Sequence, residues 1–214
     1  MKSILSWSGG KDSCLATIKA LELGYKPIVL LNMMNENGKV SRSHGLTQNI
    51  LKQHANALKI PLVGIPTTWA DYEKKYIETL CQLKKDYGVE SVVFGDIDLE
   101  PHREWEQKVC QQAKLEAILP LWQKDRLELV KEIIEENIVC MIVSCNTTMG
   151  VEFLGKILTK ETVQQLIDLN IDPCGENGEF HTVVINCPLF DTPIILPKYK
   201  KEIYQNYCFL VWEE

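Results

Sequence analysis

A six-residue segment near the start of the chain has the residue types of a phosphate-binding loop: Ser8-Gly9-Gly10-Lys11-Asp12-Ser13. Its two glycines let the backbone turn tightly and approach a ligand without a side-chain clash. The helix expected to follow offers backbone N–H groups and a partial positive charge to an anion. Ser8 and Ser13 add hydroxyl donors, and Lys11 adds a full positive charge. Asp12 could cap the helix or hold a magnesium ion.

Two other glycine-rich phosphate motifs do not fit this segment. In the Walker motif, the first glycine would fall at Leu5 and a Ser or Thr would stand at Asp12. The segment also lacks the GxGxxG spacing of dinucleotide-binding folds. An ordinary glycine turn before a helix remains the alternative, but six such residues between a first strand and a helix favour a phosphate site.

A second segment, Cys-Gly-Glu-Asn-Gly-Glu-Phe-His-Thr at residues 174–182, carries two carboxylates between glycines. Glu176 and Glu179, three residues apart on a flexible turn, could coordinate magnesium or orient an amine. His181 and Thr182 follow and lead into an apolar run. A surface turn with solvated glutamates would have the same spacing, so the spacing alone leaves both interpretations open.

The elements that would position the first loop alternate between strand and helix. Short apolar runs predict strands over 3–7, 27–31, 62–65 and 91–94, and amphipathic patterns predict helices over 12–23, 46–58, 72–87 and 103–114, with a long loop over 32–44. This order indicates an α/β fold with a parallel sheet covered on both faces. Ligands bind beyond the carboxyl ends of such strands. The first loop and the Gly95-Asp96 pair both follow strands at that edge.

The second half of the chain has a different pattern of predicted helices and strands. It predicts helices over 127–136 and 161–169 and short strands over 140–144, 182–186, 194–196 and 208–212, several of them separated by prolines. This mixture indicates a smaller α+β domain. We therefore expect one domain over residues 1–120 and a second over residues 121–214.

Composition limits the classes of partner. The net charge is −6, without the clustered Lys and Arg of a nucleic-acid surface. Lys198, Lys200 and Lys201 are interpreted as a solvated turn. No apolar run approaches the ~20 residues that span a bilayer, and no secretory signal is visible. We expect a cytoplasmic protein that binds neither nucleic acid nor membrane and whose eight cysteines are free, mostly in the core.

The first loop resembles the signature of the PP-loop ATP pyrophosphatases, in which it binds the pyrophosphate portion of ATP. Together with residues 174–182, it resembles the diphthine–ammonia ligase family, whose hallmark is a GExGE(F/Y)xT segment. The resemblance covers nearly the whole chain, including Gly95-Asp96-Ile97, Arg103-Glu104-Trp105 and Pro120-Leu121-Trp122. It implies an N-terminal nucleotide-binding domain of the HUP type and a smaller C-terminal domain that carries the GExGE segment.

The resemblance also implies a reaction. ATP adenylates the carboxylate of diphthine, a modified histidine of a translation elongation factor, and ammonia then displaces AMP to leave an amide. This makes the chain an AMP-forming, carbon–nitrogen ligase that uses ATP with Mg²⁺. A homodimer is the assembly that the family suggests.

Roles carried over from the family fall into three groups. The nucleotide would contact Ser8, Gly9, Gly10, Lys11, Asp12, Ser13, Gly95 and Asp96. The catalytic residues would be Lys11, Asp12, Glu176 and Glu179, with Asp12 as the magnesium ligand. The substrate would contact His44, Arg103, Glu176, Glu179, His181 and Thr182. The residues themselves leave Arg103 open between a bidentate anion contact and a surface ion pair, and they suggest His54 as a packing histidine.

Two other functions compete with the ligase. A PP-loop tRNA-modifying enzyme would need a basic RNA-binding surface and often has paired cysteines, and neither is visible. A nucleotide-sensing module would bind ATP or AMP without turnover. The presence of Lys11, Asp12 and both glutamates favours chemistry, and a measurement of ATP turnover would separate the sensing module from both enzymes.

Overall fold

The computed structural model describes residues 1–213 and divides the chain into two compact units that do not follow chain order. Unit 1 comprises Met1–Ser8, Asp12–Arg42 and Lys59–Gln123. Unit 2 comprises Gly9–Lys11, Ser43–Leu58 and the chain from Lys124 onward. The domain boundary expected near residue 120 stays a prediction.

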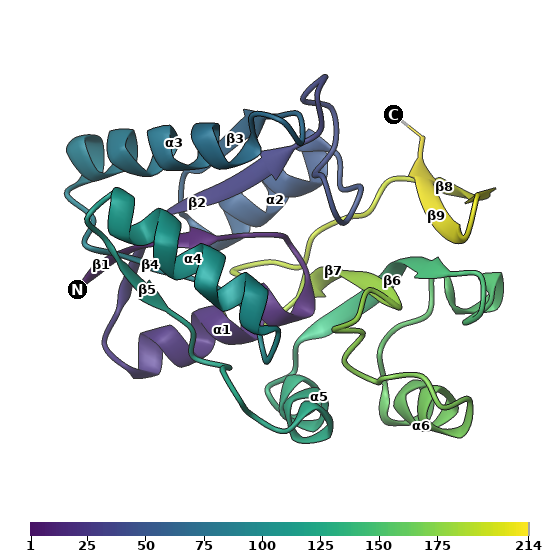
Figure 1. Ribbon diagram of the computed structural model, residues 1–214. Coiled ribbons are helices and arrows are strands. Elements are labelled where there is room, and N and C mark those ends of the chain that lie inside the picture. The colour runs from purple at the N-terminus through teal and green to yellow at the C-terminus, as the bar shows by residue number, and fades with distance from the viewer. Residues whose placement is uncertain (214) are drawn as a thin grey trace. The chain divides into compact units, whose positions relative to one another are not determined.

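Unit 1 is built on a five-stranded parallel sheet (Figure 1). Its strands are β1 (Lys2–Ser6), β2 (Lys26–Met34), β3 (Leu62–Pro66), β4 (Ser91–Val93) and β5 (Glu116–Ile118), in the order β3-β2-β1-β4-β5. The chain winds outward from β1 to β3 and then resumes at β4 on the other side of β1. This reversal creates a topological switch point between β1 and β4, where open parallel sheets bind their ligands. The predicted α/β class is confirmed.

Three helices belong to this unit: α1 (Lys11–Glu22), α3 (Tyr72–Tyr87) and α4 (Glu100–Gln112). The buried face of α3 presents Tyr76, Leu80 and Leu83, spaced three and four residues apart, to a core that also contains alternate residues of β2 and one residue each of β1 and β4. Gly88 ends α3 in a left-handed conformation, and its N–H donates to the Lys84 carbonyl. Figure 1 shows α3 and α4 running along one side of the sheet and α1 on the other.

Unit 2 contains a smaller antiparallel sheet in the order β7-β6-β9-β8. Its elements are α2 (Gln48–Leu58), α5 (Arg126–Glu135), β6 (Val139–Asn146), the 3₁₀ turn Val151–Phe153, α6 (Lys160–Asp168), β7 (Phe180–Asn186), β8 (Tyr199–Tyr204) and β9 (Tyr207–Trp212). Asp125 and Thr159 cap α5 and α6, because each side chain accepts a hydrogen bond from a first-turn N–H. The predicted α+β mixture is confirmed.

Several predicted elements differ from the structure. Strand β2 continues to Met34, so the loop expected over the polar stretch 32–44 is shorter. The first residue of that stretch, Asn32, is buried and donates to the Trp7 carbonyl at 2.8 Å. Helix α4 begins at Glu100 rather than 103. Residues 194–196 form no strand, because proline flanks them on both sides and cannot donate to a ladder. Strand β5, whose first residue is charged, was not predicted.

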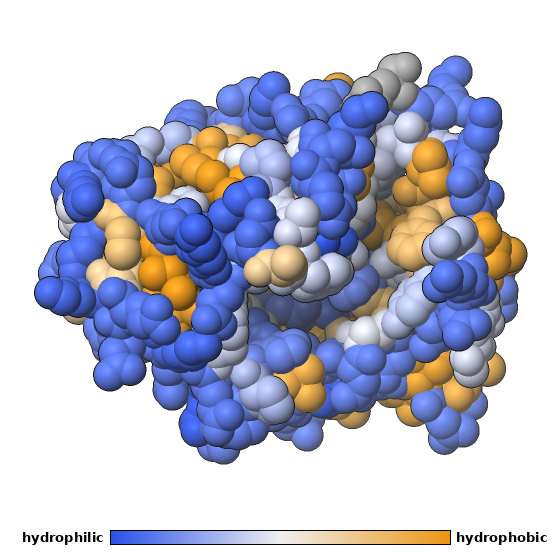
Figure 2. Space-filling model, turned by 45° about the horizontal axis from the view of Figure 1, so that its top comes forward, coloured by the Kyte–Doolittle hydropathy of each residue, from blue (hydrophilic) through white to orange (hydrophobic). Residues whose placement is uncertain are grey.

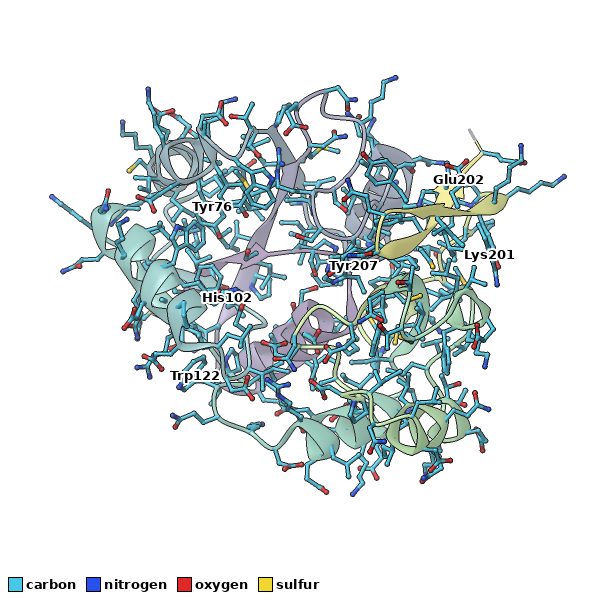
Figure 3. All side chains as sticks on the ribbon, turned by 45° about the vertical axis from the view of Figure 1, so that its right-hand side comes forward. Tyr76, His102, Trp122, Lys201, Glu202 and Tyr207 are labelled. Atoms are coloured by element: carbon cyan, nitrogen blue, oxygen red, sulfur yellow. The ribbon has the colours of Figure 1, made fainter. Side chains whose placement is uncertain are left out.

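The lysines near the C-terminus are exposed as predicted, but the predicted turn is wrong, because Lys200 and Lys201 lie on β8, the edge strand of the sheet. Lys201 is labelled in Figure 3. The surface seen in Figure 2 is mostly hydrophilic and is interrupted by separate apolar patches. All eight cysteines are free thiols. Among the helices of residues 1–213, none has the length and apolarity needed to cross a bilayer.

Candidate active site

In unit 2, strand β7 holds the central residues of the predicted phosphate loop. The Val184 N–H donates to the Gly9 carbonyl at 2.9 Å. The Lys11 N–H donates to Thr182 Oγ1 at 3.0 Å, in a bond between residues 171 positions apart in the chain. The strand that follows the glutamate-rich turn therefore fixes the backbone of Gly9–Lys11.

Two histidines bind the carbonyls of the same strand. His44 Nδ1 lies 2.8 Å from the Thr182 carbonyl oxygen, and His54 Nε2 lies 2.7 Å from that of Val184. A carbonyl can only accept, so these ring nitrogens carry the protons. The His44 ring also packs on the loop, since a Cβ atom added to Gly10 would lie 2.5 Å from its Cε1. A side chain at position 10 would therefore displace the His44 ring.

Both histidines are neutral at pH 7. Burial lowers the pKa of His44 to about 4; its bond to Thr182 opposes this shift, and the positive charge of Lys11 adds to it. Burial also lowers the pKa of His54 to about 4, against the effect of its bond to Val184. His54 is fully buried and its ring lies 5.4 Å from that of Phe190, which confirms its interpretation as a packing histidine.

Lys11 is only 3% exposed, and its ammonium nitrogen lies 5.4 Å from the centre of the Phe180 ring. Water screens a buried charge poorly, so Lys11 attracts an anion more strongly than a surface lysine does. On the same strand, the His181 ring lies 4.7 Å from the ring of His44. The structure thus gathers Lys11, His44, His181 and Thr182 into one cluster.

The turn before β7 carries the two predicted glutamates. Glu179 accepts hydrogen bonds from the backbone N–H and side-chain amide of Asn177, at 3.0 and 3.2 Å. The Glu176 N–H donates to Asp172 Oδ2 at 3.2 Å. Asp172 did not stand out in the sequence, since an aspartate in a loop carries no distinctive signal.

The remaining loop residues belong to unit 1. Ser8 Oγ donates to Ser13 Oγ at 3.1 Å. A Cβ atom added to Gly95 would lie 2.9 Å from the carbonyl carbon of Asp12 and from the nitrogen of Ser13. The loop after β4 therefore touches the first turn of α1, which follows β1, at the sheet edge where both motifs were expected.

Asp96, next to Gly95, is tied to helix α4. Its Oδ1 lies 2.7 Å from Nδ1 of His102, which is labelled in Figure 3. Burial raises the pKa of Asp96, but hydrogen bonds with His102 and Glu106 outweigh it, so the net shift is downward. Glu106 is only 3% exposed and was not predicted; a glutamate on the buried face of a helix is the signal that could have found it.

Arg103 forms an ion pair with Glu100 on the same helix, with Nη2 and Oε1 2.5 Å apart, and its guanidinium lies 4.8 Å from the centre of the Trp122 ring. Its side chain is 33% exposed. The surface ion pair that the sequence left open is present, and the anion contact of Arg103 stays a prediction.

Within residues 1–213, no three His, Cys, Asp or Glu side chains gather into a group that could hold a metal ion. Asp12, in the first turn of α1, is the carboxylate predicted for magnesium. A Mg²⁺ ion commonly takes one or two protein carboxylates and completes its coordination with substrate phosphates and water. A single aspartate beside a phosphate loop fits that pattern.

Two family models match this chain. One is described as the diphthamide synthase N-terminal domain and matches residues 1–117; the other is described as the diphthamide synthase C-terminal domain and matches residues 125–213.

Relatives named diphthine–ammonia ligase occur in several eukaryotes. The protein from Schizosaccharomyces pombe is 29% identical over 96% of this chain and 37% of its own length. The Homo sapiens protein is 26% identical over 94% of this chain and 85% of its own. The chain thus spans just over a third of the first relative and most of the second. A solved structure described as a predicted tRNA methyltransferase subunit from Methanocaldococcus jannaschii has a TM-score of 0.48 at 19% identity, covering 88% of this chain and 98% of that one. That likeness is too low to support a conclusion.

Proposed function

This chain belongs to the diphthamide synthase family, and we propose that it is an ATP-dependent ligase that adenylates a diphthine-like carboxylate and then transfers ammonia to it. The observation that carries the proposal is the hydrogen bonding between Gly9–Lys11 and strand β7. This pairing joins the loop that would hold ATP phosphates to the strand that follows the glutamate turn. The joined loop and strand can act on a nucleotide and an acceptor together.

The first step would join the acceptor to the nucleotide. A carboxylate oxygen attacks the α-phosphorus of ATP, the bond from that phosphorus to the bridging oxygen breaks, and pyrophosphate leaves. The product is an acyl adenylate, in which the carboxylate oxygen has become part of a good leaving group. Exclusion of water protects this intermediate from hydrolysis.

The second step would form the amide. The nitrogen of ammonia attacks the acyl carbon, the bond from that carbon to the AMP oxygen breaks, and a proton is lost from nitrogen. AMP is the leaving group and keeps one oxygen of the original carboxylate.

The loop residues would act on the nucleotide. Ser8, Ser13 and the backbone of Gly9 and Gly10 would hold its phosphates at the N-terminus of α1. Lys11 would stabilise the negative charge that grows on the leaving pyrophosphate, and its burial strengthens this effect. Asp12 would hold Mg²⁺, which supplies further charge neutralisation at the phosphates when bound.

The remaining predicted residues would contact the acceptor or lie near the nucleotide. Glu176, Glu179 and His181 would contact the acceptor or the ammonia. Neutral His44, with its Nδ1 proton bound to Thr182, would present Nε2 as a hydrogen-bond acceptor. Thr182 would position the loop through its bond to Lys11. In unit 1, Gly95 and Asp96 would lie near the nucleotide, and Arg103 would bind an anionic group of the substrate.

Oxygen-isotope transfer tests the adenylation step. An acceptor with an ¹⁸O-labelled carboxylate is incubated with the protein, ATP, magnesium and ammonium, and the AMP is analysed by mass spectrometry. We expect one ¹⁸O atom in the AMP phosphate. Amide formation with unlabelled AMP would refute carboxylate adenylation.

A further inference from the structure

Asp172, in the segment between α6 and β7, gathers three donors around one carboxylate. Its Oδ2 lies 2.5 Å from Nη1 of Arg126 and accepts the Glu176 N–H at 3.2 Å. Its Oδ1 accepts the Cys174 N–H at 3.0 Å. Cys174 Sγ in turn donates to the Arg126 carbonyl at 3.2 Å, so the start of α5 and the glutamate turn are joined twice.

This carboxylate is well shielded. The side chain of Asp172 is 12% exposed and that of Arg126 is 26% exposed. Charge-assisted hydrogen bonds in such surroundings are roughly twice as strong as neutral ones, and two backbone N–H bonds to one carboxylate define the path of the chain between them. By comparison, the side chains of the Lys131–Glu128 pair on α5 are 51% and 69% exposed.

We propose that Asp172, paired with Arg126, is a positioning residue that sets the direction of the Glu176 side chain toward the acceptor. This rests on the proposed function. Glu176 follows the glycine of a flexible turn, and its backbone N–H is bound to Asp172 Oδ2. Because the carboxylate holds that peptide unit, it restrains the backbone from which the Glu176 side chain projects. Asp172 needs no contact with substrate to act in this way.

The test uses Asp172→Asn in the full chain. The amide can accept with one oxygen, but its NH₂ group cannot accept from Arg126 or from Glu176 N–H. We expect KM for the acceptor to rise about tenfold, the effect of one buried hydrogen bond to a charged group, while KM for ATP changes less than about twofold. Glu128→Gln, which removes an exposed ion pair of α5, is the matched control and should leave both constants unchanged.

A double-mutant cycle separates positioning from mere stabilisation. If Asp172 acts through Glu176, then Asp172→Asn adds nothing to the KM effect of Glu176→Gln. Arg126→Lys, which keeps the charge, should retain part of the acceptor affinity that Arg126→Ala loses. Additive effects in the cycle, or equal losses for ATP and acceptor, would overturn the proposal.

Failure of the proposed function would look different, because wild type itself would then form no AMP with any acceptor. Amide hydrogen exchange, which needs no turnover, then decides the inference. We expect faster exchange at Cys174 and Glu176 in Asp172→Asn than in wild type. Unchanged exchange at both amides would refute the positioning role whatever the reaction.

Discussion

Replacement of Thr182 by valine removes one hydroxyl and retains the shape of the side chain. That hydroxyl accepts the Lys11 N–H at 3.0 Å, and Thr182 is only 1% exposed. The Lys11 backbone would lose this acceptor in a place that water hardly reaches. A buried donor deprived of its partner costs about 1–3 kcal/mol. We expect Thr182→Val to lower the free energy of unfolding by that amount.

The loss should also appear in ATP binding. Without the Thr182 hydroxyl, the Lys11 N–H regains a partner only when the loop moves. The ATP-binding conformation of the loop then becomes less stable than the moved conformation by part of the same free energy. A change of about 1.4 kcal/mol corresponds to a tenfold weaker affinity. We therefore expect the ATP dissociation constant of Thr182→Val to rise by up to about tenfold.

Denaturant unfolding and titration calorimetry measure the two effects. Thr182→Ser is the matched control, because it keeps the hydroxyl and loses only the methyl group. We expect the serine variant to retain most of the ATP affinity that the valine variant loses. Equal affinities and equal unfolding free energies for the valine and serine variants would refute a role for this bond in holding the loop.

Two further predictions concern close packing and pH. A methyl group on Gly95 would meet the backbone of Asp12 and Ser13, so Gly95→Ala should lower the free energy of unfolding by about 1–3 kcal/mol and weaken ATP binding in calorimetry. Gly64→Ala, whose methyl group meets the flexible Met34 side chain instead, should lower this free energy less. A larger loss in Gly64→Ala than in Gly95→Ala would contradict this explanation. Burial lowers the pKa of His54 from 6.5 to about 4, so the unfolded chain takes up this proton at a higher pH than the folded chain does. The stabilising contribution of neutral His54 is therefore present above pH 6.5, and the free energy of unfolding falls by about 3 kcal/mol as the pH falls toward 4. Unfolding free energies measured across this range should fall more steeply in wild type than in His54→Gln, and equal slopes would show that His54 is not the group responsible.

Local patterns predicted the elements with strong periodicity. The bounds of α3 agree with the prediction because Tyr76, Leu80 and Leu83 mark one buried face and Gly88 ends the helix in a conformation that suits glycine. Strand β8 was missed for the opposite reason, since all six of its residues are exposed and no apolar alternation marks an edge strand. The loop after β1 was predictable because its chemistry lies within six consecutive residues.

Local sequence patterns could not predict the tertiary contacts that assemble the site. The bond between Lys11 and Thr182 joins residues 171 positions apart, and the pairing of Val184 with Gly9 depends on the tertiary path of both segments. The ion pair between Asp172 and Arg126 likewise joins residues 46 positions apart. The resemblance to a ligase family grouped the two motifs, but it did not predict that β7 binds the loop directly.

The most direct test of the central claim is a Lys11→Ala comparison. Wild type and variant are incubated with magnesium, ammonium, ATP labelled in its AMP and pyrophosphate portions, and an elongation factor that carries diphthine. We expect AMP and pyrophosphate in equal amounts from wild type, only when the diphthine acceptor is present, and almost none from Lys11→Ala. Equal turnover by the variant, or ATP binding by wild type without turnover of this acceptor, would contradict the proposed reaction.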